Sequence, residues 1–476
     1  MKSKLAVLAA VLLASVSLGA APAPKAPPAG PMPPQENQTL AYNILRDIIA
    51  VHSIHSVGTK GVADVLVRYL KQGGFKDDEI HALADPKYPH QMNVVVRIKG
   101  TGKGKPVMWI CHMDIVEAKA SDWSKPPFKL TEEGGYYYGR GTTDMKDSDA
   151  AVAASLIRLK KEGYVPDRDI IVAFTADEEV GLEQDGPAWL LKAHPELVNA
   201  GLVINPDGDS GEIVNGKRMD FGIETSQKIY VTFTMSVTNK GGHSSQPRPD
   251  NAIYQLAEGL TKLSHYQFPF SLNDSTKLYF RKMAQFETGA RKADFLAVSQ
   301  PKPDLAAAAR LAKDTPLNAI LHSTCVATML SGGHQENALP QLATATIQCR
   351  IMPNETPDGT RAALQKVVGP NVQVKQLEYV VQAKESAPDP VLFAKFEKVV
   401  HGMWGPVPVI PAMAAGASDS IFTRNAGIPS YGVSGGWADS YDSRAHGRDE
   451  RREKGAFYQS VEFTHRLMKE LTGGGT

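Results

Sequence analysis

The sequence predicts an α/β protein in two parts: a three-layer domain built on a mostly parallel sheet, and a smaller α+β domain inserted into it. Two observations support this fold class. Short apolar runs alternate with segments of helical spacing over residues 37–225, and after about residue 226 the pattern changes to longer alternating strands. A chain of 476 residues is also too long for one ordinary hydrophobic core, so two domains are expected.

The first domain begins with two segments of helical spacing, QTLAYNILRDIIAV and KGVADVLVRYLKQGG, and the second ends in glycines that suit a helix C-cap. Four apolar runs follow: MNVVVRIKG, PVMWICHMD, DIIVAFTADEE and AGLVINPDG. Helical segments such as DAAVAASLIRLKKEG separate them. This alternation is typical of a parallel sheet covered by helices. The runs break off into His, Asp or Glu, and such sheets build their sites at the carboxyl ends of strands.

The inserted domain is predicted over residues 226–385. A long alternating strand, KIYVTFTMSVTNK, precedes the helix DNAIYQLAEGLTKL, and later come NALPQLATATIQCRIMP, DGTRAALQKVV and VQVKQLEYVV. Two strand-helix-strand units of this kind are typical of an α+β domain. Residues 265–320 between them are polar and helical in pattern, and the sequence assigns them no role. The α/β pattern then returns, so residues 386–474 are expected to complete the first domain.

The first twenty residues, MKSKLAVLAAVLLASVSLGA, carry lysines, an apolar run and then small residues suited to signal-peptidase cleavage. We expect a signal peptide over residues 1–20, a Pro/Ala-rich spacer over 21–36, and a periplasmic or secreted protein. The alternative is a retained membrane anchor. Because the apolar run is shorter than the roughly 20 residues that a span needs, no membrane span is expected in the mature form.

Composition limits the partners. Apolar residues make up 42% and charged residues 22%, as in a soluble globular protein. A net charge of +1 leaves no basic excess for nucleic acid, so no nucleic-acid partner is expected. The three cysteines are too few for a disulfide framework, even in an exported protein. Cys111 should face the core, because its neighbour His112 points to the opposite face of the strand.

Acidic residues and histidines gather at the predicted strand ends and in the loops that follow. They are His112, Asp114, Asp144, Glu178, Glu179, Asp207 and His446. So many carboxylates would repel one another if they met without a cation, and a metal ion is the usual compensation. A mixed His and carboxylate set suits Zn²⁺ or a similar first-row ion, whereas an all-oxygen set would indicate Ca²⁺ or Mg²⁺. No single motif is specific, since DEE alone is usually a solvated turn. The prediction rests on the occurrence of all these residues in this order along the chain.

The ordered series CHMD, GRGTTDMK, ADEE, NPDG, GGHSSQP and HGRDE resembles the zinc exopeptidases of metallopeptidase family M20. That family includes aminoacylase, carboxypeptidase G and succinyl-diaminopimelate desuccinylase. The resemblance covers nearly all of the chain after the spacer. It implies that the three-layer domain is catalytic and that the inserted domain is a lid that mediates dimerisation. One departure is Met145, which stands where the family often has a second acid, so the turn around Asp144 is expected to differ locally.

The resemblance also implies a role for each residue of the series. Asp144 would bridge two zinc ions, or cobalt or manganese ions, with His112 and Asp207 on one ion and Glu179 and His446 on the other. Asp114 would orient His112. Glu178 would be the general base that takes the proton of the metal-activated water. Asp209 and Glu212 lie close enough in sequence to be rivals of Asp207.

Four further residues match family positions at the substrate. His243 would reach into the partner subunit's site to stabilise the oxyanion, which implies a homodimer. Asn337 and Arg350 would bind the oxyanion or the substrate's terminal carboxylate, and Gly416 would bring its backbone to the substrate. The planar fork of Arg350 suits a carboxylate. The alternatives are a loop histidine for His243 and a surface arginine for Arg350.

Together these patterns predict an exported di-zinc metallopeptidase that acts on short peptides as a carboxypeptidase or dipeptidase. An N-acyl amino acid amidohydrolase is the alternative. A non-catalytic peptide-binding protein on the same scaffold would require a broken ligand set or a missing base. The sequence has neither, because all five ligands and Glu178 are present.

Overall fold

The computed structural model of the chain describes residues 29–180, 185–208, 210–377, 380–439, 442 and 444–475. The predicted signal peptide and residues 21–28 of the predicted spacer lie outside these ranges. Within them, no helix combines the length and the apolar character that crossing a membrane requires.

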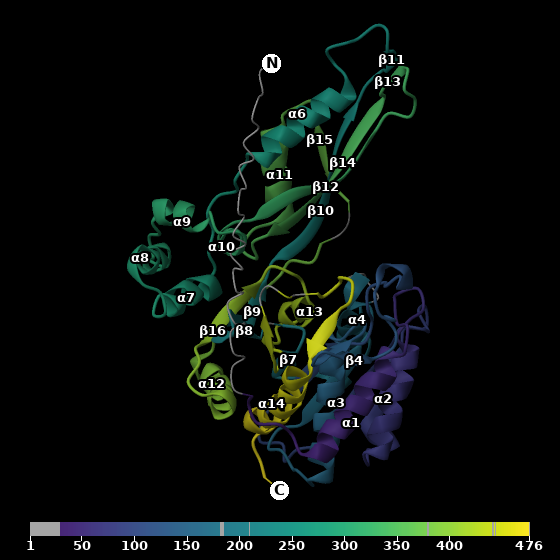
Figure 1. Cartoon of the computed structure of the whole chain (residues 1–476), viewed down its shortest axis with the longest axis vertical. Helices are drawn as coiled ribbons and strands as arrows, with labels where there is room; N and C mark the ends of the chain where they lie inside the picture. Colours follow the sequence, from purple (N-terminus) through teal and green to yellow (C-terminus); the bar gives the residue numbers. More distant parts are fainter. Residues whose placement is uncertain are drawn as a thin grey trace, which may run out of the picture.

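A ten-stranded mixed sheet forms the larger layer of the molecule (Figure 1). Its order is β1-β2-β6-β3-β7-β17-β9-β8-β18, with β16 also paired to β9. The central strands β6, β3, β7 and β17 run parallel, as the sequence predicts. The strands are β1 (Ile80–Ala84), β2 (Met92–Ile98), β3 (Val107–His112), β6 (Ile170–Thr175), β7 (Leu202–Asn205), β8 (Gly211–Val214), β9 (Lys217–Gln227), β16 (Val409–Ala414), β17 (Ser430–Gly432) and β18 (Trp437–Asp439).

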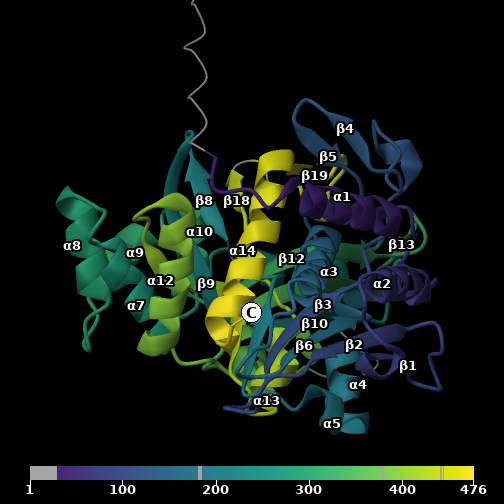
Figure 2. The same cartoon turned by 90° about the horizontal axis from the view of Figure 1, so that it is seen from below.

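Helices cover both faces of this sheet, which gives three layers (Figure 2). One face carries α1 (Gln35–Ile49), α2 (Lys60–Gln72), α3 (Lys146–Lys161), α12 (Pro390–Trp404) and α14 (Lys454–Thr472), and the other carries α4 (Gly186–Ala193), α5 (Pro195–Val198) and α13 (Ser420–Asn425). Strand β3 supplies side chains to both layers by alternation. Trp109 and Cys111 join the larger core, whereas Met108 and Ile110 pack with Leu190 of α4. The prediction that Cys111 faces the core is confirmed.

A second, antiparallel sheet stands beyond one edge of the first, and we call it the lid sheet (Figure 1). Its order is β12 (Thr324–Gly332), β14 (Leu342–Ile351), β10 (Ile229–Thr238) and β15 (Gln373–Gln376). Helices α6 (Ala252–Ser264) and α11 (Pro357–Val368) cover one face around Phe233, Ile347 and Leu364. At its far end β11 (Gly242–His243) pairs with β13 (Ala338–Leu339). The division into a catalytic domain over 37–225 and 386–474 and a lid over 226–385 stays a prediction.

The segment without an assigned role is helical, as its pattern predicts. It forms α7 (Asp274–Met283), α8 (Gly289–Val298), α9 (Leu305–Leu311) and α10 (Thr315–Leu321), with a small core of its own. Its ends hold the connection between the two sheets: Asn273 Nδ2 donates to Ser226 Oγ at 3.0 Å, and Lys228 Nζ donates to His322 O at 2.7 Å. A further small sheet consists of β4 (Thr131–Glu133), β5 (Tyr136–Tyr138) and β19 (Arg451–Glu453), and the short 3₁₀ turns are η1 (Asp77–Glu79), η2 (Ala120–Asp122) and η3 (Glu178–Val180).

The structure corrects the expectation about the cysteines. Cys325 of β12 and Cys349 of β14 form a disulfide. They are direct partners in the antiparallel register, which brings their side chains together. The three cysteines therefore include one cross-strand bridge, and only Cys111 is free. Sequence spacing could not reveal this pair, because the register of β12 against β14 depends on the fold of the whole lid sheet.

Candidate metal centre

Three parallel strands deliver the candidate ligands to one edge of the large sheet. His112 is the last residue of β3, Glu178 and Glu179 form η3 just after β6, and Asp207 lies two residues after β7. Strands β6, β3 and β7 are neighbours and run parallel, so their carboxyl ends meet. The structure therefore brings together the residues that the sequence pattern placed at strand ends.

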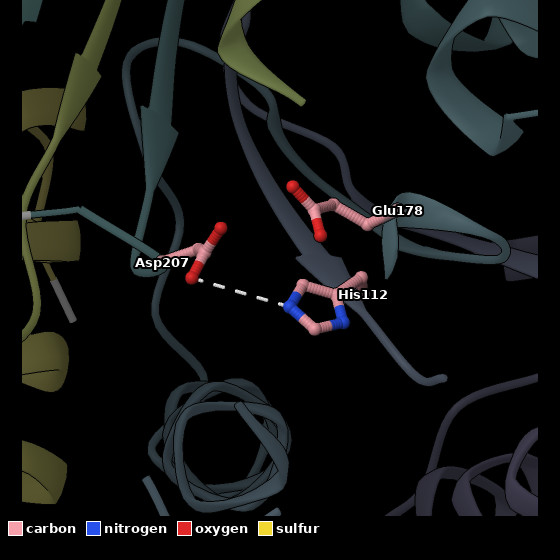
Figure 3. A group of neighbouring side chains, drawn as sticks. All are labelled: His112, Glu178 and Asp207. Carbon is pink, nitrogen blue, oxygen red and sulfur yellow. Dashed lines mark ion pairs between the residues drawn. The ribbon is translucent and has the colours of Figure 1, made fainter. Parts of the chain in front are cut away.

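Asp144 lies between two histidines, in the loop before α3. Its Oδ1 is 3.2 Å from His112 Nε2, and its Oδ2 is 3.0 Å from His446 Nε2. The same His446 nitrogen is 3.1 Å from Glu179 Oε2. Asp207 Oδ1 lies 4.0 Å from His112 Nε2, on the other side of the group (Figure 3). Each oxygen of Asp144 thus faces a different imidazole, which is the arrangement of a carboxylate shared by two ions.

The donor set fits metal ions. Two ligand atoms bound at about 2.1 Å to a tetrahedral ion lie about 3.4 Å apart, close to the separations seen here. Two groups have all their ligand atoms within 4.8 Å of one another: His112 with Glu178 and Asp207, and His112 with Asp144 and Glu179. His112 Nε2 is buried and makes no hydrogen bond within the described residues. A buried polar atom without a hydrogen bond, surrounded by carboxylate oxygens, is the mark of a metal ligand.

His112 has the tautomer that a ligand needs. Its Nδ1 lies 3.2 Å from the backbone oxygen of Asp114, and a carbonyl oxygen can only accept, so Nδ1 carries the proton. The lone pair of neutral His112 is then on Nε2, the atom that faces Asp144. The Asp114 carboxylate lies 3.6 Å from the same Nδ1. It also accepts from Glu178 N at 3.2 Å and Glu179 N at 3.0 Å.

Proton affinities within the group reflect its excess of negative charge. Hydrogen bonds to Asp144 and Glu179 raise the pKa of His446 to about 10. Burial alone would raise the pKa of Asp144, but the adjacent His112 and His446 hold it below its usual value. Burial raises the pKa of Asp207 well above normal, although His112 lowers it in part. A metal ion would supply the positive charge that these carboxylates attract, and its binding would release protons from the ligands.

Glu178 is placed for proton transfer. Its carboxylate points toward the space between His112 and Asp207 (Figure 3). Burial raises its pKa well above the usual value; His112 opposes this, and the charges of Asp207 and Asp419 reinforce it. A carboxyl group with a raised pKa beside a candidate metal centre suits general acid–base chemistry. Its neighbour Glu179 instead faces His446, so the two adjacent carboxylates lie in different parts of the group.

The structure shows the surroundings of Met145, which departs from the family pattern, and tests the alternatives to Asp207 as a ligand. Met145 is buried, its Sδ accepts a hydrogen bond from His112 N at 3.3 Å, and the peptide bond between Asp144 and Met145 is cis. Of the rivals to Asp207, Glu212 lies in β8 and in neither ligand group, and Asp209 lies outside the described residues.

Two of the predicted substrate residues lie far from this centre in their own chain. His243 is in β11 and Asn337 just before β13, at the end of the lid sheet distant from the large sheet (Figure 1). They are neighbours, since Ser244 N donates to Asn337 O at 3.1 Å. Strand β10 has ten residues, so the tip lies roughly 30 Å from the connection between the sheets. Neither residue joins the metal group of its own subunit.

Arg350 and Gly416 lie closer to the centre. Arg350 is near the end of β14 that adjoins the large sheet, with its guanidinium 4.6 Å from the centre of the Tyr230 ring. Burial lowers its pKa, whereas Tyr230 and Glu178 raise it, so its charge interacts with the proposed base. Its Nε donates to Gln348 Oε1 at 3.2 Å. Gly416 follows β16 in an exposed loop, and a Cβ there would meet nothing within 4 Å.

Sequence reasoning missed buried charged residues around the centre, among them Asp185, Arg140 and Glu450. Asp185 and Asp419 form a carboxyl pair behind Glu178, and Arg140 and Glu450 form an ion pair with Nη1 and Oε2 2.7 Å apart. Glu450 ends the HGRDE motif and Arg140 lies within GRGTTDMK. Both residues therefore belong to the quoted motifs, but the sequence assigned no role to either. Their partners lie some 300 residues away in sequence, and no local pattern indicates such a contact.

Comparisons with known proteins give a match at the level of the family. The family profile described as "Peptidase family M20/M25/M40" matches residues 108–470. The N-fatty-acyl-amino acid synthase/hydrolase PM20D1 of Xenopus tropicalis is 27% identical over 379 residues, which is 76% of this chain and 72% of that protein.

Two solved structures share the fold. The M20 family metallo-carboxypeptidase Sso-CP2 from Sulfolobus solfataricus has a TM-score of 0.65 at 20% identity, over 90% of this chain and 98% of that one. The di-peptidase Dug1p from Saccharomyces cerevisiae has a TM-score of 0.64 at 15% identity, over 93% of this chain and 98% of that one.

Proposed function

The chain belongs to peptidase family M20/M25/M40, and from this premise we propose that it is a di-zinc hydrolase of short peptides with a free carboxyl terminus. Such an enzyme would be of the carboxypeptidase or dipeptidase type. The observation that carries the proposal is Asp144, whose two oxygens face His112 and His446 at 3.2 and 3.0 Å. A carboxylate in this position can hold two ions side by side.

The ligands divide between two positions. His112 and Asp207 would complete one, and Glu179 and His446 the other, with Asp144 common to both. Bound there, zinc would polarise the scissile carbonyl and lower the pKa of water toward neutrality. Cobalt or manganese would accept the same mixed nitrogen and oxygen donors. Asp114 keeps the imidazole of His112 in the tautomer that presents Nε2.

Glu178 would carry the proton in this reaction. It takes a proton from the attacking water and delivers it to the leaving amine, and both transfers need a carboxyl group within hydrogen-bond reach of the reacting atoms. Burial raises the pKa of Glu178, and a carboxyl group whose pKa is raised holds a transferred proton more readily.

Arg350 would bind the substrate's terminal carboxylate. Only its Nε makes a hydrogen bond within the described residues, which leaves both terminal nitrogens of the fork for a bidentate pair. The interaction between the charges of Arg350 and Glu178 supports a position within the same cleft. Gly416 would contribute backbone contacts, since its exposed loop carries no side chain there to block an approach.

An N-acyl amino acid amidohydrolase is the second candidate. The similarity to the N-fatty-acyl-amino acid synthase/hydrolase of Xenopus tropicalis favours it. The two functions need the same metal ions, the same base and the same carboxylate-binding arginine. They differ only in whether the group on the far side of the amide is an amino acid or an acyl chain.

His243 and Asn337 lead us to infer that the enzyme works as a homodimer. They lie too far from their own metal centre to act there, whereas the tip of a partner's lid sheet could supply them. Ser245 N donates to His243 Nδ1 at 3.2 Å, so neutral His243 carries its proton on Nε2 and can donate to an oxyanion. Strand β12 offers a contact surface, because it is an edge strand with exposed Val326, Met329 and Leu330.

We also propose that the protein is exported. The support comes from the first twenty residues, with their lysines, apolar run and small residues before Ala20. An enzyme outside the cytoplasm with this specificity would release amino acids from external peptides.

The test is hydrolysis of a panel of dipeptides, longer peptides and N-acyl amino acids by the zinc-loaded protein, with the Glu178→Gln variant alongside. We expect cleavage of substrates with a free carboxylate. In the variant, which keeps the shape of the side chain but cannot take a proton, we expect a rate about 10²–10⁴-fold lower. Turnover confined to N-acyl amino acids would select the second candidate. Full activity in the variant would remove Glu178 from the proton path.

A further inference from the structure

Glu450 is completely buried beside the loop that carries Asp144, although it is no metal ligand. Five donors surround its carboxylate. Oε2 accepts from Arg140 Nη1 at 2.7 Å and Gly141 N at 3.1 Å. Oε1 accepts from Thr143 N at 2.8 Å, Thr143 Oγ1 at 2.9 Å and Asp144 N at 3.2 Å. Because every partner donates, only the ionised carboxylate satisfies them all.

Arg140 connects this loop to the second ligand loop. While Nη1 pairs with Glu450, Nη2 donates to His446 O at 3.3 Å and to Gly447 O at 3.1 Å. His446 needs such support, because its φ of 61° lies in the left-handed region that non-glycine residues rarely adopt. The Arg140 side chain is only 3% exposed, so water has little access to its guanidinium.

We propose that Arg140 and Glu450 form a clamp that positions the two ligands Asp144 and His446 for a pair of metal ions. The proposal rests on the metal centre proposed above and assigns a role to residues that touch neither ion. Glu450 fixes the backbone on either side of the bridging carboxylate. Arg140 fixes the loop that presents His446 against Asp144 and Glu179.

The clamp matters because the two loops come from distant parts of the chain. Asp144 precedes α3 and His446 precedes β19, and each loop alone could move its ligand by an ångström or more. Hydrogen bonds to charged partners in a buried site resist such movement, and residues behind metal ligands typically contribute 10–100-fold to metal affinity. A planar guanidinium can hold a carboxylate and two carbonyl oxygens at once, whereas a lysine ammonium cannot reproduce that spread.

Two variants separate the parts of the clamp, with Co²⁺ as the probe. In Arg140→Lys the loop of His446 loses its support, so one of the two ions should bind about 10–100-fold more weakly while the other stays near wild type. In Glu450→Gln the side-chain amide points its N–H groups at the N–H and O–H groups that donate to the carboxylate in the wild type. These unfavourable contacts should disturb the loop of the bridging Asp144, so both ions should bind more weakly. The measurements are competition titrations against a chelator and the visible absorption spectrum of bound Co²⁺.

A matched control comes from another buried pair. Arg424 is also 3% exposed, donates to Glu224 Oε1 at 3.0 Å and to the backbone oxygen of Ser430, and contacts no candidate ligand. Arg424→Lys should lower the unfolding temperature of the metal-free protein about as much as Arg140→Lys, with both Co²⁺ affinities unchanged.

Two results would overturn the clamp: Co²⁺ affinities and spectra in both variants equal to those of the wild type, or no pair of ions in the wild type. A wild type that binds two ions tightly but hydrolyses no substrate would overturn the proposed function and leave the clamp standing.

Discussion

Asp114 illustrates how one buried side chain can organise a whole site. Its oxygens accept from the backbone of Glu178 and Glu179, and its carboxylate also lies 3.6 Å from the protonated nitrogen of His112. The proposed base Glu178 and the proposed ligands His112 and Glu179 therefore all depend on a single carboxylate for their orientation. His112 is the last residue of β3 and Asp114 follows it by two positions, so the end of one strand delivers both side chains to the site.

The substitution Asp114→Asn tests this role. An amide has one accepting oxygen in place of two, so one of the two backbone N–H groups loses its partner and His112 loses a charged neighbour. We expect zinc affinity to fall about 10–100-fold, with the fold retained. The measurement is a competition titration with a zinc chelator. Asp122→Asn, which removes an exposed acid of η2, is the control and should bind zinc like the wild type.

At the residue scale, the sequence pattern indicated which candidate ligands lie together but not which residues support them. The candidate ligands His112, Glu179 and Asp207 stand at or just after strand ends, and parallel strands that share a sheet must bring those ends together. Arg140 and Glu450 obey no such rule, because a contact between residues 140 and 450 depends on how α3 and β19 pack in the finished fold. Both residues lie in the quoted motifs, but only the structure shows which groups they contact.

At the scale of elements, a pair of buried carboxyl groups joins α4 to α13. Asp185 caps α4 and accepts from Ala188 N at 3.3 Å, and Asp419, at the start of α13, accepts from Thr175 Oγ1 at 3.1 Å. Burial and the nearby charge of Asp419 both raise the pKa of Asp185, so we expect the two carboxyl groups to share one proton. Burial raises the pKa of Asp419 to about 6, with the charge of Asp114 adding to the rise and that of His112 opposing it.

This pair should make stability depend on pH. A carboxyl group whose pKa is raised in the folded state stabilises the fold fully below its unfolded pKa of about 4, and that contribution is lost as pH rises through about 6. In Asp419→Asn the amide always has a proton to share. Relative to the wild type, the variant should gain up to about 3 kcal/mol in the free energy of unfolding between pH 4 and pH 8.

Urea unfolding of both proteins across this pH range measures the gain. Asp389→Asn serves as the control, since it alters an exposed N-cap carboxylate of α12 and should show no such trend. A difference between wild type and Asp419→Asn that stays constant from pH 4 to pH 8 would show that the pair shares no proton.

Elements with local patterns were predictable, and those with long-range partners were not. The glycines after KGVADVLVRYLKQ end α2 as expected, since Gly74 adopts a φ of 97° that suits a C-terminal cap. The helices of residues 265–320 were visible as a pattern, but their role in holding the connection between the sheets was not. That role depends on Asn273 and Lys228, which meet partners 47 and 94 residues away.

At the scale of the whole molecule, the two ends of the lid sheet lie at different distances from the metal centre. The end of the lid sheet that adjoins the large sheet carries Arg350, and the far end carries His243 and Asn337, away from the metal centre of their own chain (Figure 1). The exposed apolar residues of β12 belong to the lid sheet, and the exposed Tyr254 belongs to α6, which packs against β12. A second subunit that covers this surface would bury apolar area and bring one lid tip to each metal centre.

Mixed dimers test this arrangement directly. His243→Ala removes the donor from a lid tip, and Glu178→Gln removes the base from a metal centre, so each variant alone should be nearly inactive. If His243 acts in the partner's site, a mixed dimer has one site with an intact base and a donor from the other subunit. Random exchange of equal amounts should then restore about a quarter of the wild-type activity.

Two controls are needed to interpret the mixed-dimer experiment. Mixing His243→Ala with a chain that carries both substitutions leaves no dimer with His243, so activity should not return. Light scattering on Leu330→Arg, which places a charge on the exposed edge of β12, should show the mass of a monomer, and that monomer should lose activity although its own metal centre is intact. Mixed dimers without recovered activity would mean that His243 has no part in the partner's site, because the intact base and the intact donor would then be present together without effect.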